Sequence, residues 1–225
     1  MSYSVKAIIF DLDGVIINSN PAIEAFWKSR TDKEGITLTD PMIREWIYGR
    51  KVVDTLKGIF NHIPDERKKE IIDSADIFDR TMEPDSIPGV ISFIEYLRSL
   101  QLPVGIVTSS QDQRMFDMLR KLGIENQFTH FVTAHDVSKG KPHPEPYLAM
   151  SSKMDIDAGD CLVFEDAISG IQSATGAGMH SVGIGNALAM PDLIHHGAKD
   201  VIPDFTGIYT DQRTFRTANG IVFNA

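Results

Sequence analysis

Acidic side chains occur in pairs at points where short apolar runs of this 225-residue chain end. The first pair, Asp11 and Asp13, follows the apolar run 5–10 and precedes Gly14, which allows the backbone to turn sharply. In such a pair one carboxylate could attack an electrophile while the other moves a proton, provided that their surroundings separate their pKa values. A solvated turn is the commoner explanation of an isolated pair, so both interpretations stay open at this point.

A second pair of carboxylates, Glu165 and Asp166, ends the apolar run 161–164. If these acids meet Asp11 in the fold, their hard oxygen atoms form a group of ligands that favours Mg²⁺. The same acids would also favour the positive end of the dipole of a helix that begins near Ala167. The two interpretations are compatible with each other.

Hydroxyl groups and a lysine supply the features of an anion site. Thr108 and Ser109 end the apolar run 103–107, where a following helix would direct free backbone N–H groups the same way as the hydroxyl groups. Helix capping could also explain these residues. Lys141 lies in the proline-rich loop 139–146, where its ammonium group could be held beside the carboxylates to bind a phosphate. An isolated lysine in such a loop is usually solvated.

Taken together, these residues indicate phosphoryl transfer. A nucleophile, a proton-transfer partner, a hydroxyl anchor, an ammonium group and metal-binding acids are the parts that this chemistry needs. The Walker pattern is absent, because no glycine precedes Gly140-Lys141 at the required spacing. A dinucleotide site is disfavoured, because Gly183-Ile184-Gly185 lacks the third glycine.

The elements that must position these residues are short buried strands. Brief apolar runs bounded by turns predict parallel strands at residues 5–10, 103–107, 161–164 and 180–184. From residue 85 onward the runs alternate with stretches of helical period. The predicted fold class is therefore α/β, with a doubly wound, Rossmann-like parallel sheet whose ligands bind beyond the carboxyl ends of the strands.

One predicted helix follows the run 103–107. Met115, Met118, Leu119 and Leu122 share one of its faces. Ser110 and Gln113 predict a capping box at its start.

Residues 17–84 interrupt the alternation, because they contain helical pattern without a convincing strand. Asn20-Pro21 and Asp40-Pro41 predict helix starts, with proline at the first helical position. The charged run from Asp65 to Arg80 predicts a further helix.

This pattern predicts two domains. We expect a Rossmann-like catalytic core of residues 1–16 and 85–225, and an all-helical cap domain of residues 17–84 inserted after the first strand. Residues 207–225 show little pattern and receive no assignment.

Charge and composition narrow the class of partner. The 22 basic and 31 acidic residues give a net charge of −9, which disfavours binding to a nucleic-acid backbone. No apolar stretch approaches the length needed to cross a bilayer. The single cysteine, Cys161, cannot form an intrachain disulfide, which favours a reducing compartment. We expect a cytoplasmic monomer that binds a small phosphorylated metabolite and neither nucleic acid nor membrane.

The motifs in their chain order resemble the haloacid dehalogenase superfamily, in its branch with a helical cap after the first strand. The matching segments are Phe10-Asp11-Leu12-Asp13-Gly14-Val15, Val107-Thr108-Ser109-Ser110, Gly140-Lys141-Pro142 and Phe164-Glu165-Asp166-Ala167. The resemblance covers residues 5 to about 205. Within the superfamily, segments that include Asn20-Pro21-Ala22-Ile23 look most like the glycerol phosphate and 2-deoxyglucose-6-phosphate phosphatases, and more distantly like β-phosphoglucomutase.

The resemblance implies roles for the four carboxylates. Asp11 would be the nucleophile that forms an aspartyl-phosphate, and Asp13 would be the general acid and then the general base. Mg²⁺ would be held by Asp11, by the backbone carbonyl of Asp13 and by Asp166. Glu165 would bind the ion directly or through water.

The resemblance also implies the contacts to the substrate. Thr108, the backbone of Ser109 and Lys141 would hold the phosphoryl oxygens. A cap loop would face the site and contact the substrate through Gly49, Arg50 and Lys51. A solvated helix face is an equally open interpretation of the two cations of this loop.

The predicted function is therefore a Mg²⁺-dependent phosphatase, a phosphoric monoester hydrolase, that acts on a small phosphorylated sugar or polyol. One alternative is a phosphomutase of the β-phosphoglucomutase type, although such relatives carry a cap histidine where this chain has Ile23. The other alternative is a non-catalytic protein that binds a phosphorylated metabolite, for which Asp11 would be dispensable.

Overall fold

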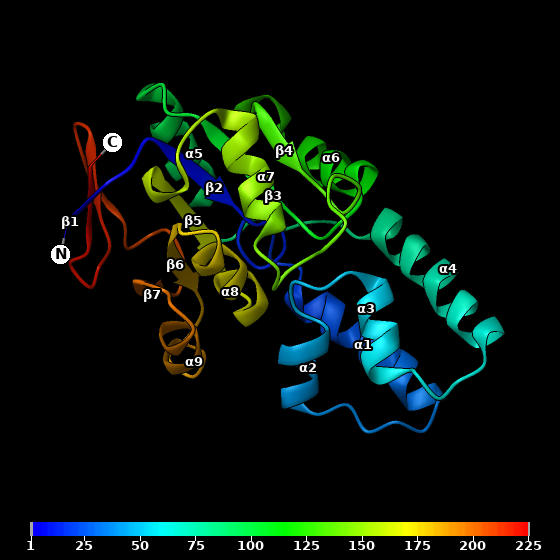
Figure 1. The fold of residues 1–225 in the computed structure, drawn as a ribbon. Helices are drawn as coiled ribbons and strands as arrows, with labels where there is room; N and C mark the ends of the chain where they lie inside the picture. Colours follow the sequence, from blue (N-terminus) through cyan, green and yellow to red (C-terminus); the bar gives the residue numbers. More distant parts are fainter. Residues whose placement is uncertain (1, 225) are drawn as a thin grey trace.

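The computed structural model describes residues 2–224, and a six-stranded parallel sheet forms its centre (Figure 1). Its strands are β2 (Ala7–Phe10), β3 (Val104–Val107), β4 (His130–Val132), β5 (Cys161–Glu165), β6 (His180–Ile184) and β7 (Asp200–Ile202). They lie in the order β4-β3-β2-β5-β6-β7, and every neighbouring pair is parallel. The predicted doubly wound α/β class is confirmed. The order of the strands reverses between β2 and β5, which is where ligands bind in such sheets.

Helices cover both faces of this sheet. They are α5 (Val90–Ser99), α6 (Asp112–Lys121), α7 (Glu145–Met154), α8 (Ile168–Gly176) and α9 (Met190–His195), with short 3₁₀ helices η1 (Glu125–Gln127) and η2 (Ala158–Asp160). Successive residues of β2 point to opposite faces, so Ile8 and Phe10 pack in the cluster that contains α5 and α6. Ala7 and Ile9 pack in the cluster that contains α7 and α8. Both faces are therefore apolar, which explains the uninterrupted apolar runs of the sequence.

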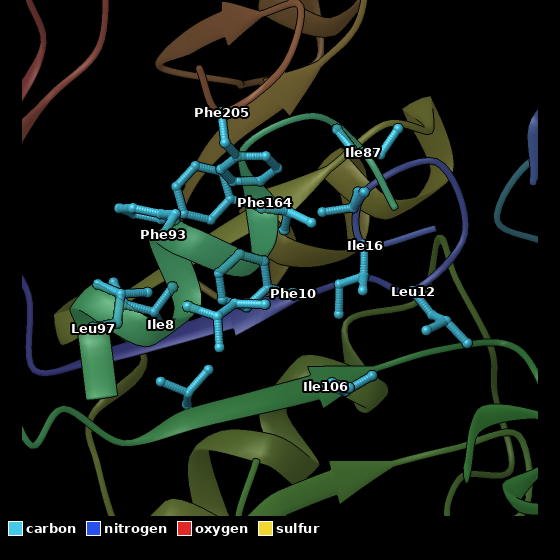
Figure 2. Close-up of a cluster of buried hydrophobic side chains, with 14 of the residues drawn as sticks. Ile8, Phe10, Leu12, Ile16, Ile87, Phe93, Leu97, Ile106, Phe164 and Phe205 are labelled. Carbon is cyan, nitrogen blue, oxygen red and sulfur yellow. The ribbon is translucent and has the colours of Figure 1, made fainter. Parts of the chain in front are cut away.

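Aromatic packing fixes β2 against β5 near their carboxyl ends. Phe10 and Phe164 are paired in register, and their rings stack with centroids 5.2 Å apart. Phe93 of α5 meets Phe164 edge-on at 5.5 Å, and Phe205 completes the group (Figure 2). Because these rings are buried, each contributes about 1.5–3 kcal/mol by removal of apolar surface from water. The acids that follow Phe10 and Phe164 are held in register by the same contacts.

Residues 20–81 form a group of four helices, drawn in blue to cyan in Figure 1. They are α1 (Asn20–Lys33), α2 (Asp40–Trp46), α3 (Val52–Ile59) and α4 (Asp65–Thr81). Their apolar faces enclose a separate hydrophobic cluster, in which Trp27 and Phe60 are buried. The predicted helix starts are found, although Ser19 and Thr39 are the capping residues, one position earlier than expected.

The chain leaves and re-enters the sheet region through two adjacent segments. The Asn18 N–H donates to the Asp85 carbonyl at 2.8 Å, and the Ile87 N–H donates to the Ile16 carbonyl at 2.9 Å. This pairing ties the start of α1 to the segment that follows α4. The division of the chain into a core domain and a cap domain stays a prediction.

A second, small sheet joins the two ends of the chain (Figure 1). Its strands are β1 (Ser2–Ser4), β8 (Tyr209–Asp211), β9 (Thr214–Arg216) and β10 (Val222–Asn224). Each strand has only three residues, and β8 is exposed throughout. Sequence periodicity cannot reveal such strands, which is why residues 207–225 received no assignment. Within residues 2–224, no helix combines the length and apolar character needed to span a bilayer.

Candidate active site

The carboxyl ends of β2 and β3 open into a cavity of about 350 Å³. The loops after these strands contribute Asp11, Asp13, Thr108 and Ser109 to its lining. The loop between α2 and α3, residues 47–51, covers the cavity from the helical side. The cavity thus lies at the sheet edge where the order of the strands reverses, as expected for this class of fold.

A buried lysine joins two of the predicted acids. The Nζ atom of Lys141 donates to Asp11 Oδ1 at 2.6 Å, to Glu165 Oε1 and to the Val107 carbonyl at 3.1 Å. The side chain of Lys141 is only 1% exposed. Burial raises the pKa of Asp11 to about 7, against the opposing effect of the Lys141 charge. Burial alone would lower the pKa of Lys141, but the charges of Asp11 and Glu165 outweigh it and raise that pKa.

Both oxygen atoms of the Glu165 side chain accept hydrogen bonds. Besides Lys141, its Oε1 atom accepts from the Tyr147 hydroxyl at 3.0 Å, and its Oε2 atom accepts from the Ala167 N–H at 3.1 Å. A Cβ atom at Gly170 would lie 1.8 Å from Glu165 Oε1, so only glycine leaves room for this carboxylate. Glu165 therefore holds Lys141 in place, and Tyr147 is a partner that the sequence did not reveal.

Three carboxylates form a group that could hold a metal ion. One oxygen atom each from Asp11, Glu165 and Asp166 lie within 4.8 Å of one another. Asp166 Oδ2 also accepts from Asn20 Nδ2 at 2.6 Å. Burial and the Glu165 charge raise the pKa of Asp166 well above its usual range. Concentrated hard oxygens with unfavourable like charges fit a divalent cation, which would relieve the repulsion.

The turn after β2 brings the backbone close to these acids. Gly14 has φ of +74°, and a Cβ atom there would lie 2.1 Å from Asp166 Oδ2. Both the conformation and the space require glycine. The sharp turn predicted from Asp13-Gly14 is thus linked to the placement of Asp166.

Asp13 is held by four hydrogen bonds. Its Oδ2 and Oδ1 atoms accept from the Nη1 and Nη2 atoms of Arg114, both at 2.7 Å. The hydroxyl groups of Ser19 and Ser110 donate to it at 2.5 and 3.2 Å. Burial alone would raise the pKa of Asp13, but the Arg114 charge and these hydrogen bonds outweigh it and lower the pKa. The two predicted catalytic acids therefore have pKa values shifted in opposite directions.

Ser110 does not cap the following helix. Gln111 occupies the capping position of α6, and no side chain closes a capping box there. The predicted box is wrong because the Ser110 hydroxyl donates to Asp13 instead. Arg114 was missed, although it lies four residues before Met118 and therefore on the same buried face of the helix.

Thr108 and Ser109 lie in the turn after β3. Thr108 is buried, and its Oγ1 atom accepts from the Ser110 N–H at 3.1 Å. The Ser109 hydroxyl donates to the Gly49 carbonyl at 2.8 Å. The turn therefore lies beside Asp11 and also anchors the loop that covers the cavity.

The covering loop is bonded to the sheet region through its backbone and its cations. Arg50 Nη1 donates to the Lys141 carbonyl at 3.0 Å, while Lys51 Nζ donates to the carbonyls of Ala134 and Val137 at 2.8 and 3.3 Å. Gly49 has φ of +67°, and a Cβ atom there would lie 2.7 Å from Ser169 Oγ. All three residues of the predicted cap contact line the cavity. The side chains of Arg50 and Lys51 donate hydrogen bonds to backbone carbonyls, so neither cation is simply solvated.

Comparisons with known proteins identify the family and the fold of this chain. Residues 8–184 match the family model described as haloacid dehalogenase-like hydrolase. The chain is 30% identical to validoxylamine A 7'-phosphate phosphatase from Streptomyces hygroscopicus subsp. limoneus, over 84% of this chain and 92% of that protein. It is 28% identical to β-phosphoglucomutase from Bacillus subtilis (strain 168), over 88% of this chain and 92% of that protein. The crystal structure of a hydrolase from Pseudomonas syringae superposes with a TM-score of 0.76 at 29% identity, covering 89% and 94% of the two chains.

Proposed function

Because this chain belongs to the haloacid dehalogenase-like hydrolase family, we propose that it is a Mg²⁺-dependent phosphatase that hydrolyses small phosphorylated sugars or polyols. One observation carries the proposal. Lys141 is buried between Asp11 and Glu165, and Asp13 lines the same cavity as Asp11. A nucleophile and a proton-transfer group therefore line one cavity that could receive a phosphate, and a charge-balancing cation lies next to the nucleophile.

The proposed reaction has two steps. A carboxylate oxygen of Asp11 attacks the phosphorus atom, and the bond from phosphorus to the ester oxygen breaks, which forms an aspartyl-phosphate. Asp13, which Arg114 and the two serines keep ionised in the free protein, would take up a proton when the substrate binds and then donate it to the departing oxygen, so that an alcohol leaves. Asp13 then takes a proton from a water molecule that attacks the phosphorus, which releases phosphate and restores the Asp11 carboxylate.

Three groups would hold the phosphoryl oxygens in this reaction. The Lys141 ammonium group would offset their negative charge next to Asp11, which it contacts at 2.6 Å. The Thr108 hydroxyl and the Ser109 backbone would contact the oxygens from the turn after β3. Lys141 and Thr108 are buried before the substrate arrives, so little reorganisation of these two groups opposes the reaction.

The metal would be held by Asp11, Asp166 and the backbone carbonyl of Asp13. When bound, Mg²⁺ would neutralise charge on the transferring group. Glu165 already accepts hydrogen bonds at both oxygen atoms, from Lys141, Tyr147 and the Ala167 N–H. We therefore infer that Glu165 meets the metal through water and acts chiefly by holding Lys141.

A phosphomutase is the second candidate, because β-phosphoglucomutase is among the relatives. A mutase must move protons to and from a sugar hydroxyl, for which the family's mutases use a cap histidine. The corresponding residue here is Ile23, whose aliphatic side chain lines the cavity and cannot carry a proton. Hydrolysis is favoured for this reason.

Phosphate release by the purified protein tests the proposal directly. The substrates are polyol, hexose, deoxyhexose and nucleoside monophosphates, each with Mg²⁺ and with a chelator, and Asp11→Asn is the control. We expect metal-dependent release from the sugar or polyol esters and none from a folded Asp11→Asn protein. Isomer formation without free phosphate would instead establish a mutase. Binding without any turnover would establish a metabolite-binding protein.

The compartment, the oligomeric state and the class of partner of this protein stay predictions. We propose a cytoplasmic monomer whose partner is a small phosphorylated metabolite rather than nucleic acid or a membrane. Sedimentation analysis of the purified protein would test the monomeric state.

A further inference from the structure

Arg114 of α6 links three parts of the molecule. Its Nη1 and Nη2 atoms donate to the two oxygens of Asp13 at 2.7 Å. Its Nε atom donates to Asp79 Oδ1, also at 2.7 Å, and Asp79 belongs to α4 of the helical segment. Nη1 donates in addition to Ser110 Oγ at 2.7 Å. The side chain of Arg114 is only 6% exposed, so these bonds are shielded from water.

The geometry of these contacts restricts the Asp13 carboxylate. A guanidinium group is planar, and two parallel hydrogen bonds from it fix both the distance and the plane of a carboxylate. A lysine would replace this fixed pair by a single point of contact, and the hydroxyl groups of Ser19 and Ser110 would be the remaining groups that orient the carboxylate. Asp79 in turn holds the guanidinium group through its Nε atom. The orientation of Asp13 therefore depends on a chain of contacts that begins on α4.

We propose that Arg114 is a positioning residue that orients the Asp13 carboxylate for proton transfer, and that Asp79 transmits the position of α4 to it. The inference rests on the proposed function, because it assigns Arg114 a task in the reaction of Asp13. Packing alone does not require this arrangement. A buried cation could be neutralised by any nearby carboxylate, whereas here both oxygens of the proton-transfer group are engaged.

A positioning role and a purely structural role predict different kinetics. If Arg114 only stabilises the fold, its loss lowers the free energy of unfolding. The relative rates of formation and hydrolysis of the aspartyl-phosphate then stay unchanged. If Arg114 orients Asp13, its loss slows the step in which Asp13 must activate water. A substrate whose leaving group needs no proton then separates the two roles, since the first step remains fast.

The experiment uses Arg114→Gln, with p-nitrophenyl phosphate as substrate and rapid mixing to follow nitrophenolate. We expect a burst of about one nitrophenolate per active site, larger than that of the wild type. We expect the steady rate after it to fall by about ten- to a hundredfold, with little change in KM. Arg114→Lys should recover part of the rate. The matched control is Arg120→Gln, which removes an exposed arginine from the same helix and should behave as the wild type.

Asp79→Asn gives a second measurement that keeps the bidentate pair intact. We expect a few-fold fall in the steady rate and a smaller burst of the same kind. If Arg114→Gln does not fold, Asp79→Asn and Arg114→Lys decide the question. A folded Arg114→Gln protein with an unchanged steady rate overturns the inference, and so does a slower rate without a burst. Absence of turnover in the wild type would instead overturn the proposed function.

Discussion

The two ends of the candidate active-site cavity differ in the side chains that form them. At the sheet end, Asp11 lines the cavity, and the cation of Lys141 is buried next to it, between Asp11 and Glu165. At the helical end, apolar side chains of α1 and α4 form the wall together with two acids, Asp76 and Asp79. The arginine and lysine side chains that line this end donate to protein groups.

This difference indicates which part of a substrate each end of the cavity would bind. The sheet end is suited to an anion because its charges are fixed and desolvated before binding. The helical end presents apolar surface and carboxylate acceptors, which suit the uncharged hydroxyl groups of a sugar or polyol. A second negative group on the substrate would meet Asp76 and Asp79 there. Substitutions at the sheet end should therefore lower turnover of every substrate, whereas substitutions at the helical end should change the selectivity between substrates.

The largest effect is expected for Lys141→Met. The change leaves the buried carboxylates of Asp11 and Glu165 without their shared cation, so the free energy of unfolding should fall by about 3–5 kcal/mol. Turnover of every phosphate ester should fall by at least about a hundredfold, because the charge that stabilises the transferring phosphoryl group is lost. Urea denaturation and phosphate release measure the two effects.

The control for this variant is Lys139→Met, which removes an exposed lysine two residues earlier in the same loop. It should leave both stability and turnover near the wild-type values. A Lys141→Met protein of wild-type stability would contradict the importance of the buried ion pairs. Selective loss of only some substrates would contradict the division between the two ends.

Charge reversal at the helical end should change selectivity rather than turnover. Asp76 lines the cavity on α4, and we expect this acid to repel anionic leaving groups, whereas the cation of Asp76→Lys would attract them. The ratio of kcat/KM for 3-phosphoglycerate to that for glycerol 1-phosphate should rise by about tenfold, as expected for charges at several ångströms in a partly screened site.

Asp73→Lys is the matched control, since Asp73 is an exposed acid on the same helix and is not part of the cavity lining. An equal rise in both variants would show that only the net charge of the protein matters. An unchanged ratio in Asp76→Lys would show that the leaving group does not lie against α4.

The sheet and the site at its edge could be predicted because both depend on local sequence. Buried parallel strands are short apolar runs, and polar residues that follow them meet at one edge of the sheet. Strands β4 and β7 were missed because each has three residues and includes a polar one, His130 in β4 and Asp200 in β7. Their position is set by pairing with neighbours rather than by their own pattern.

The remaining site residues could not be predicted because their partners are distant in sequence. Tyr147 and Asn20 act through contacts with Glu165 and Asp166, which depend on the packing of α7 and α1 against the strand ends. The cations of the covering loop bind backbone carbonyls. Every residue has a carbonyl group, so no sequence pattern identifies such a partner.

A smaller effect, at the boundary between the two ends, is expected for Lys51→Ala. The Lys51 ammonium group donates to the carbonyls of Ala134 and Val137, so its loss loosens the covering loop rather than removing a contact to the leaving group. We expect kcat/KM to fall about three- to tenfold, by the same factor for an aryl phosphate and for a sugar phosphate. Steady-state kinetics on both substrates measure this.

Lys57→Ala, which removes an exposed lysine of α3, is the control and should change neither substrate. A larger loss for the sugar phosphate than for the aryl phosphate would establish Lys51 as a direct contact to the leaving group. The helical end of the cavity would then contribute a cation to substrate binding as well as apolar and acidic side chains.

The smallest effect concerns the loop that receives Lys51. Burial alone would raise the pKa of Asp136, but hydrogen bonds from Lys153 and from the Thr133 backbone outweigh it and lower the pKa. A lowered pKa stabilises the folded state above the unfolded value of about 3.9, and this contribution is lost as the pH falls through the folded value. Asp136→Asn should therefore cost under about 1 kcal/mol near pH 7, because the pair is partly exposed, and progressively less below about pH 4.

Urea denaturation, repeated at intervals of about one pH unit between roughly pH 3 and pH 7, measures this difference in the free energy of unfolding. Asp73→Asn serves as the reference for loss of an exposed acid on α4. If the difference between wild type and Asp136→Asn stays constant down to the lowest pH, the carboxylate charge of Asp136 does not hold the loop. The Lys51 contact would then depend on backbone packing alone, and the covering loop would keep its place over the cavity in acid. If the difference shrinks as expected, closure of the helical end weakens in acid because the carbonyls that receive Lys51 lose their support.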